Sequence, residues 1–270
     1  MGMADLTGPR AKLGRADEHL RSIDAELRRV TMEQTESSYI TFWRDESWYI
    51  VRADPLPPLP LRIALLAGDC LNNLRATLDH LVWQLVLREG QNPEGRQCFP
   101  LCETQAEFTK KVVLPSHRGN RHAPLYGIPP NGDAWALIEH AQPFHRPQPQ
   151  EHPLAWVARF NNVDKHRTLL VRRAFLDVEA LVQRVLWEPN LQPIQRKLSA
   201  PFVSAEHPTD IARLLFPEGT ELRMYMEGDF PAQPTIGDGE ADVSLSVLRH
   251  AADCIQQVLN QASALPRVQG

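Results

Sequence analysis

One long amphipathic segment constrains the fold of this chain more than any other feature. Between residues 61 and 87 leucine and valine recur every three or four positions, which predicts a single α-helix with one buried face. The apolar positions on that face are Leu71, Leu74, Leu78, Leu81, Val82 and Leu85. A helix this apolar has to be packed inside a domain, so the fold must be organised around it.

A stripe of polar and small residues runs along the other side of the same helix. At about 100° per residue its members share one face, with Arg75 at the edge. We call it the polar stripe; its members are Asp69, Asn72, Asn73, Ala76, Asp79, His80 and Trp83. Polar groups on a packed helix need partners or a ligand. A second polar segment, residues 161–167, ends a later predicted helix and is the expected counterpart of the stripe.

The remaining periodicities predict an α+β protein. Helical spacing predicts long helices near residues 9–34, 60–88, 151–166 and 240–263, which would form a bundle. Strand-like runs predict a hairpin near residues 38–53 and an antiparallel sheet mainly from residues 168–230, with a loop from 229 to 239. Residues 1–270 are expected to form a single domain. It could be subdivided into 1–167, mostly helical, 168–239, strand-rich, and 240–270, a helix that returns to the bundle.

The first predicted helix carries a narrow apolar seam that resembles one side of a coiled coil. Its members are Leu13, Ala16, Leu20, Ile23, Leu27 and Val30. The seam could pair with a helix of the same chain, which is the commoner arrangement, or with a second protomer. A homodimer formed through helical faces is therefore one expected assembly.

Composition excludes several classes of protein. A hydrophobic content of 43% and a net charge of −4 are typical of a globular chain and provide no overall attraction to nucleic acid. No apolar run reaches the ~18 residues of a membrane span, and no secretory signal pattern begins the chain, so we expect a cytoplasmic protein without membrane contact. The nucleotide-binding and zinc-protease motifs are missing, and adjacent donors such as Asp79 and His80 diverge on a helix, so neither a cofactor nor a metal is predicted.

One segment reverses the acidic balance of the chain. Residues 108–132 contain four lysines or arginines and no acid. The segment is either a solvated loop or a flap that binds phosphates. For the second case the candidate RNA-binding residues, including two from the later polar segment, are Lys110, Lys111, Arg118, Arg121, Lys165 and Arg167.

The polar stripe contains side chains suited to phosphodiester cleavage. His80 could transfer protons near neutral pH, and Arg75 could hold a phosphate. Asp79 or Asp164 could orient an imidazole. A metal-independent ribonuclease needs such groups to activate a ribose hydroxyl and to protonate the leaving oxygen. The candidate catalytic residues are Arg75, Asp79, His80, Asp164 and His166.

The segment from Arg75 to His80 resembles the R-x4-6-H signature of HEPN-family proteins, helical-bundle domains common in prokaryotic toxins and defence systems. This resemblance implies an RNA-cleaving site built from Arg75 and His80, commonly at a dimer interface. The same spacing recurs at Arg146/His152 and Arg159/His166, but the first pair lies on the strongly periodic helix beside other polar groups. The chain also resembles a bacterial family with an N-L-R-x-x-L-D-H helix and a later D-K-H-R block, over roughly residues 60–170; that family implies no established activity.

Two functional hypotheses follow. The first is a HEPN-like RNA-binding protein or metal-independent ribonuclease. The second is a non-enzymatic interaction or ligand-binding protein whose polar stripe is architectural. In the second case the stripe would form a buried network with the later segment, joining Asp69, Asn72, Arg75 and Asp79 to Asn161, Asp164, Lys165 and Arg167.

Overall fold

The computed structural model divides the chain into two compact units. It describes residues 3–32, 40–117, 120–174, 178–179, 185–186, 193–198, 202–204, 206–220, 225–226 and 233–266. The helical unit comprises Met1–Ala25, Leu65–Leu169 and Ser246–Gly270, and the sheet unit comprises Glu26–Ala64 and Leu170–Leu245. Helices and antiparallel strands together confirm the predicted α+β class.

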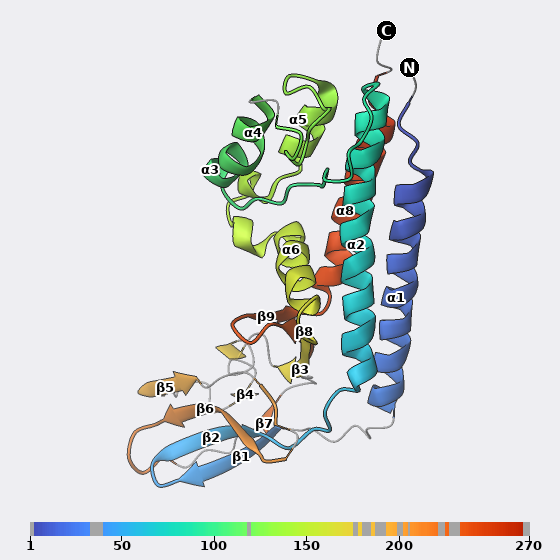
Figure 1. Cartoon of the computed structure of the whole chain (residues 1–270). Coiled ribbons are helices and arrows are strands. Elements are labelled where there is room, and N and C mark those ends of the chain that lie inside the picture. The colour runs from blue at the N-terminus through green and yellow to red at the C-terminus, as the bar shows by residue number, and fades with distance from the viewer. Residues whose placement is uncertain are drawn as a thin grey trace. The chain divides into compact units, whose positions relative to one another are not determined.

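Three long helices form the framework of the helical unit (Figure 1). They are α1 (Thr7–Met32), α2 (Leu61–Arg88) and α8 (Val247–Ser263). The six predicted core positions of α2 are all fully buried, because they recur at the helical period on one face. Most of the α1 seam, including Leu13, Ala16 and Leu20, is also buried within the chain. Arg249 of α8 forms an ion pair of 2.7 Å with Asp24 of α1. Among the described residues, no helix combines the length and apolarity needed to cross a bilayer.

Shorter helices complete this unit. They are α3 (Gln105–Phe108), a π-helical turn (Thr109–Val113), α4 (Leu114–His117), α5 (Asp133–His140), two 3₁₀ turns (Pro143–His145 and Pro149–Glu151) and α6 (Pro153–Asp164). The irregular chain between them is held by buried glutamines. Gln142 donates to the carbonyl oxygens of Pro100 (2.9 Å) and Ile138 (2.8 Å), and its own Oε1 accepts from the Cys102 amide (3.1 Å). Buried side-chain amides therefore replace regular secondary structure as the support of this stretch.

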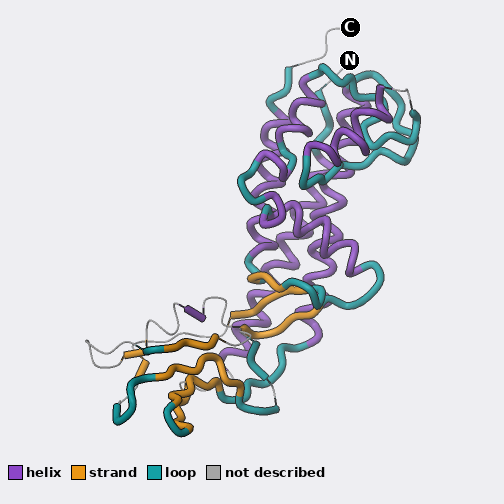
Figure 2. The backbone as a smooth tube through the Cα atoms, turned by 90° about the vertical axis from the view of Figure 1, so that its left-hand side faces the viewer, coloured by secondary structure: helices purple, strands orange, loops and turns teal. Residues whose placement is uncertain are grey.

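A four-stranded antiparallel sheet dominates the sheet unit (Figure 2). Its order is β1 (Ile40–Asp45), β2 (Trp48–Ala53), β6 (Thr209–Leu215) and β5 (Gln195–Leu198). The first two strands form the predicted hairpin. Buried side chains of β1, β2 and β6, together with Phe216, form the hydrophobic core of this sheet. They are Ile40, Tyr49, Val51, Ala53, Ile211, Ala212, Leu214 and Phe216.

Two smaller sheets complete the sheet unit, and the first of them corrects the predicted boundaries near residue 240. They are β3 (Leu170–Ala174) with β8 (Gln233–Gly237) and β9 (Asp242–Ser244), and β4 (Val185–Leu186) with β7 (Tyr225–Met226). The predicted loop at 229–239 therefore contains a strand, and the last helix begins at Val247 instead of residue 240.

The cause of the later helix start is a tight turn at Asp238. Its Oδ1 accepts hydrogen bonds of 3.0 Å from the amides of Glu240 and Ala241, which returns the chain into β9. Asp242 then forms an ion pair with Arg172 across the sheet (2.7 Å). Glu240 and Asp242, at the predicted helix start, thus lie in a turn and in β9.

Candidate functional site

Two residues of the polar stripe region hold the backbone of Phe99. Arg75 forms an ion pair with Asp79, with Nη2 2.8 Å from Oδ1, and the same Nη2 donates to the Phe99 carbonyl oxygen at 2.8 Å. Oδ1 of Asp79 accepts from the Phe99 amide at 2.9 Å. The Phe99 side chain is itself fully buried. We call Arg75, Asp79 and Phe99 the Phe99 clasp.

The polar groups of the Phe99 clasp are bonded to one another. Its guanidinium and carboxylate neutralise each other, and both also pair with the two polar groups of one buried residue's backbone. Arg75 would have to break these bonds to grip a phosphate with the same atoms. The neighbouring Cys98 thiol is not an activated nucleophile, because burial raises its pKa.

A second contact joins the stripe to α6, as the sequence predicted. Nδ2 of Asn72 donates to Oδ2 of Asp164 at 3.3 Å. A Cβ placed on Gly68 would lie 2.4 Å from Oδ1 of Asp164, so the carboxylate fills the space beside a residue without a side chain. Burial raises the pKa of Asp164, and the negative charge of Asp69 raises it further, against the opposing hydrogen bond from Asn72.

The contact between the stripe and α6 differs in kind from the predicted ion-pair network. Asn72 and Asp164 form a hydrogen bond without charge neutralisation, and the positive partner of Asp79 comes from α2 itself. Asn161 is buried, and its Oδ1 has no hydrogen-bond partner among the described residues. The described contacts therefore anchor the stripe at two points, the Phe99 backbone and Asp164.

Gly68 offers a direct test of the close approach between α2 and α6. Gly68→Ala should lower the free energy of unfolding by about 1 kcal/mol, because the new methyl group displaces Asp164 at a cost above the gain in helix propensity. The matched control is Gly14→Ala in α1, where an added Cβ meets nothing within 4 Å. It should raise stability by about 1 kcal/mol. Urea denaturation measures both, and equal gains in the two variants would show that the approach is not tight.

The histidines of the predicted catalytic set lie apart from the Phe99 clasp. His80 is exposed and lies beside α1, with Nδ1 3.7 Å from the position of a Cβ on Gly8. Arg75 and His80 diverge by about 140° around the helix axis, because they are five residues apart. His166 is exposed in the turn after α6. The contacts described for Arg75 and His80 share no residue.

The predicted basic flap is partly neutralised by acids from outside it. Lys111 pairs with Glu107, and the hydrogen bond between them raises the pKa of the lysine. Arg121 pairs with Glu94 at 2.8 Å. The remaining predicted RNA-binding residues that the structure describes are exposed, namely Lys110, Lys165 and Arg167; Arg118 lies outside the described residues.

One face of the four-stranded sheet carries aromatic and basic side chains from strands that lie far apart in the sequence. The backbone register aligns Trp43, Ile50, Arg213 and Lys197 in one row across β1, β2, β6 and β5. Directly opposed residues in antiparallel strands project from the same face. We call this the aromatic–basic face; its members are Trp43, Trp48, Arg52, Lys197 and Arg213.

Cations lie over both tryptophan rings of this face. The Arg52 guanidinium carbon is 5.1 Å from the Trp43 ring centroid, and the Lys197 Nζ is 4.7 Å from that of Trp48. Trp43 is nevertheless 56% exposed. The cation–π contacts hold both rings in place and leave Trp43 exposed, whereas Trp48 is partly buried.

The face keeps a small excess of positive charge. Asp210 forms ion pairs with Arg52 (2.7 Å) and Arg213 (2.8 Å). Burial alone would raise the pKa of Asp210, but the hydrogen bonds from the two arginines outweigh it and lower the pKa. Among the described residues, two carboxylates, those of Asp210 and of Asp45 at the end of β1, stand against the three cations of the face. In a chain of net charge −4, this balance favours an anionic partner.

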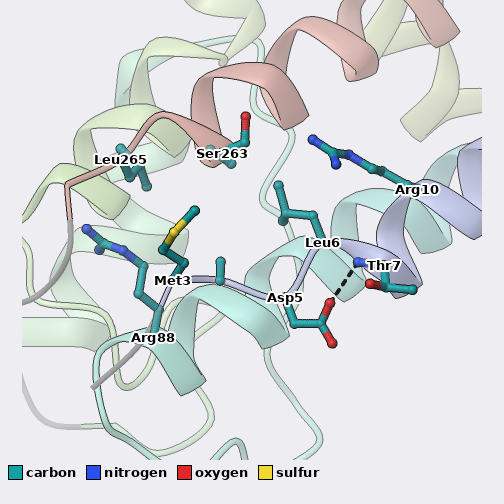
Figure 3. Close-up of a pocket in the computed structure, with 10 residues that line it drawn as sticks. Met3, Asp5, Leu6, Thr7, Arg10, Arg88, Ser263 and Leu265 are labelled. Carbon is teal, nitrogen blue, oxygen red and sulfur yellow. Dashed lines mark hydrogen bonds between the residues drawn. The ribbon is translucent and has the colours of Figure 1, made fainter.

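A bundle-end pocket of about 380 Å³ lies where α1 begins and α2 and α8 end (Figure 3). Figure 3 shows the apolar side chains of Met3 and Leu6 between Arg88 and Arg10. Arg88 is buried and donates to the carbonyl oxygen of Pro266. The volume is sufficient for a small molecule, but the predicted catalytic and RNA-binding residues do not line the pocket.

Comparisons with known proteins found no match: no model of a known protein family, no curated protein and no solved structure matches the chain. The resemblance to HEPN-family proteins therefore stays a prediction from the segment Arg75 to His80. Within the part of the chain that is described, no three His, Cys, Asp or Glu side chains are placed to hold a metal ion.

Proposed function

We propose that this protein binds single-stranded RNA through the aromatic–basic face and that the polar stripe is architectural. The observation that carries the proposal is Trp43, whose side chain is 56% exposed with Arg52 over its ring. Tryptophan is usually well buried in folded proteins, so this exposure calls for a partner. Unpaired bases stack on such rings, and lysine and arginine beside them neutralise the phosphates.

The layout of the sheet supports this proposal. Trp43 lies on β1 and Lys197 on β5, and these are the two edge strands. The register row places Ile50 and Arg213 between them. A strand of RNA laid across the sheet would meet a ring at one edge and cations toward the other, which suits stacking together with phosphate contacts.

The Phe99 clasp supports RNA binding without cleavage. Arg75 and Asp79 are bonded to each other and to the Phe99 backbone, as expected of residues that support the fold. The proposed function therefore keeps the predicted RNA partner and assigns it to a different surface.

Trp43→Ala is expected to weaken binding of a fluorescent single-stranded oligoribonucleotide by about 10- to 100-fold in an anisotropy titration, because one stacked base is worth ~1–3 kcal/mol. The matched control is Trp83→Ala, which removes a second exposed tryptophan (40% exposed) from α2 in the helical unit. This control should bind RNA as the wild type does.

Two outcomes would contradict the proposal. Equal affinities for wild type and Trp43→Ala would remove the aromatic–basic face from RNA recognition. The same RNA, incubated with wild type in the presence of a chelator, should stay intact. Cleavage that disappears in a folded His80→Ala variant would instead establish the ribonuclease hypothesis.

A further inference from the structure

A small polar pocket lies among α5, α6 and α8 in the helical unit, away from the polar stripe. Its volume is about 80 Å³. It is lined by His140, Ala141, Gln142, Arg146, His152, Leu154, Cys254, Gln257, Val258 and Gln261. These residues include three groups that can carry positive charge and no aspartate or glutamate. We call it the Arg146 pocket.

Arg146 provides positive charge that the described residues do not neutralise. Its side chain is exposed, and its guanidinium forms no hydrogen bond or ion pair with any residue that the structure describes. The positive charge of Arg146 acts on two side chains that line the pocket, those of His152 and Cys254. Burial lowers the pKa of His152, and Arg146 lowers it further. Burial also raises the pKa of the Cys254 thiol; Arg146 opposes that effect, and the neighbouring Asp253, which does not line the pocket, adds to it. A bound anion would relieve this uncompensated charge.

The neutral groups of the Arg146 pocket supply hydrogen-bond donors. Nδ1 of His152 accepts from the Leu154 amide at 3.2 Å, so in the neutral ring the proton is on Nε2. Gln257 and Gln261 are one turn apart on α8, and each side-chain amide can donate two hydrogen bonds. Donors from two helices and a guanidinium therefore surround a space without a carboxylate.

We infer that the Arg146 pocket binds a phosphate group, either as inorganic phosphate or as the end of a phosphate monoester. Its volume is well below the ~300–1,000 Å³ that encloses a whole organic ligand. A neighbouring depression of about 370 Å³ shares His140 and Gln261 with it and is also lined by Leu137, Leu265 and, among acids, Asp133. The organic part of a monoester would lie in this depression, with its phosphate held by Arg146.

This inference goes beyond the proposed RNA binding and does not depend on it. The aromatic–basic face belongs to the sheet unit, whereas every residue of the Arg146 pocket belongs to the helical unit. A variant of one surface should leave the other unchanged, so the failure of either proposal can be recognised by itself.

Isothermal titration calorimetry with inorganic phosphate and with adenosine monophosphate, in a chloride buffer of fixed ionic strength, tests the site. Arg146→Gln should weaken binding by about 10- to 100-fold, since a hydrogen bond to a charged group is lost. The matched control is Arg10→Gln, which removes the same charge from an exposed arginine of the bundle-end pocket and should change nothing.

The two ligands distinguish the sources of the phosphate. Tighter binding of the monophosphate, lost in Arg146→Gln, would support a monoester ligand; binding of inorganic phosphate with equal or greater affinity would support the free ion. No binding by folded wild type, or equal weakening in Arg146→Gln and Arg10→Gln, would overturn the inference. RNA affinity should be the same in Arg146→Gln and wild type, and a selective loss of RNA binding there would instead assign the pocket to the RNA surface.

Discussion

Replacing Gln142 with leucine is expected to lower the free energy of unfolding by about 3–4 kcal/mol. The Gln142 side chain is 1% exposed and makes three hydrogen bonds to backbone groups, so the variant leaves the Cys102 amide and two carbonyl oxygens without partners. Each unpaired buried group costs ~1–3 kcal/mol, and leucine retains most of the volume of glutamine. The loss therefore measures the polar contacts and not a cavity.

Urea denaturation of Gln142→Leu beside Gln148→Leu provides the comparison. Gln148 is an exposed glutamine of the same proline-rich stretch, and its replacement should change stability by less than about 0.5 kcal/mol. Hydrogen exchange adds a local readout, because the Cys102 amide should exchange faster in Gln142→Leu alone. Similar stabilities for the two variants would mean that the stretch from Pro100 to Gln142 is held by other contacts.

Gln142 also illustrates which parts of the fold were predictable from the sequence. The helical period of α2 identified six core positions that are all fully buried, because apolar spacing depends on local geometry alone. The partners of Gln142 lie up to 42 residues away, and tertiary packing decides which backbone groups they are. No local pattern marks a glutamine as buried.

The pairing of the strands was unpredictable for the same reason. β6, Thr209–Leu215, lies within the predicted strand-rich range, but its pairing with β2 joins segments more than 150 residues apart in sequence. β8 lies within the predicted loop and contains Pro234, which cannot donate a hydrogen bond to a sheet. This proline lies at the second position of the strand, and pairing with β9 begins at the next residue, Thr235.

For the candidate site, local geometry again predicted part of the arrangement. The stripe and its contact with α6 were predicted from periodicity, and the bond between Asn72 and Asp164 joins those two segments. The hydrogen bonds from Arg75 and to Asp79 at the Phe99 backbone could not be predicted, because Phe99 lies in an irregular segment of the chain. The hairpin was predicted with Trp43 and Trp48 in it, but the face they form depends on the distant strands β5 and β6.

The Phe99 clasp gives the second large expected effect. Arg75→Ala should lower the free energy of unfolding by about 2–3 kcal/mol, because it leaves the Phe99 carbonyl oxygen unpaired and the Asp79 carboxylate without its cation. A double-mutant cycle with Asp79→Ala should show a coupling energy of about 1–2 kcal/mol, since both residues hold the same backbone. The control cycle uses Arg15 and Glu18, an ion pair on α1 whose side chains are 59% and 52% exposed. Its coupling should be about 0.5 kcal/mol or less.

The cycle separates an architectural arginine from a catalytic one. A catalytic Arg75 could be removed with little loss of stability, because a group that acts on a substrate does not have to support the fold. An architectural Arg75 must cost stability and must couple to Asp79 more strongly than an exposed pair does. Arg75→Lys sharpens the distinction, since it keeps the charge but loses the two-point bond to the carboxylate, and its stability should lie between those of wild type and Arg75→Ala. Unchanged stability in Arg75→Ala, Arg75→Lys and Asp79→Ala would contradict an architectural role and would favour a catalytic one.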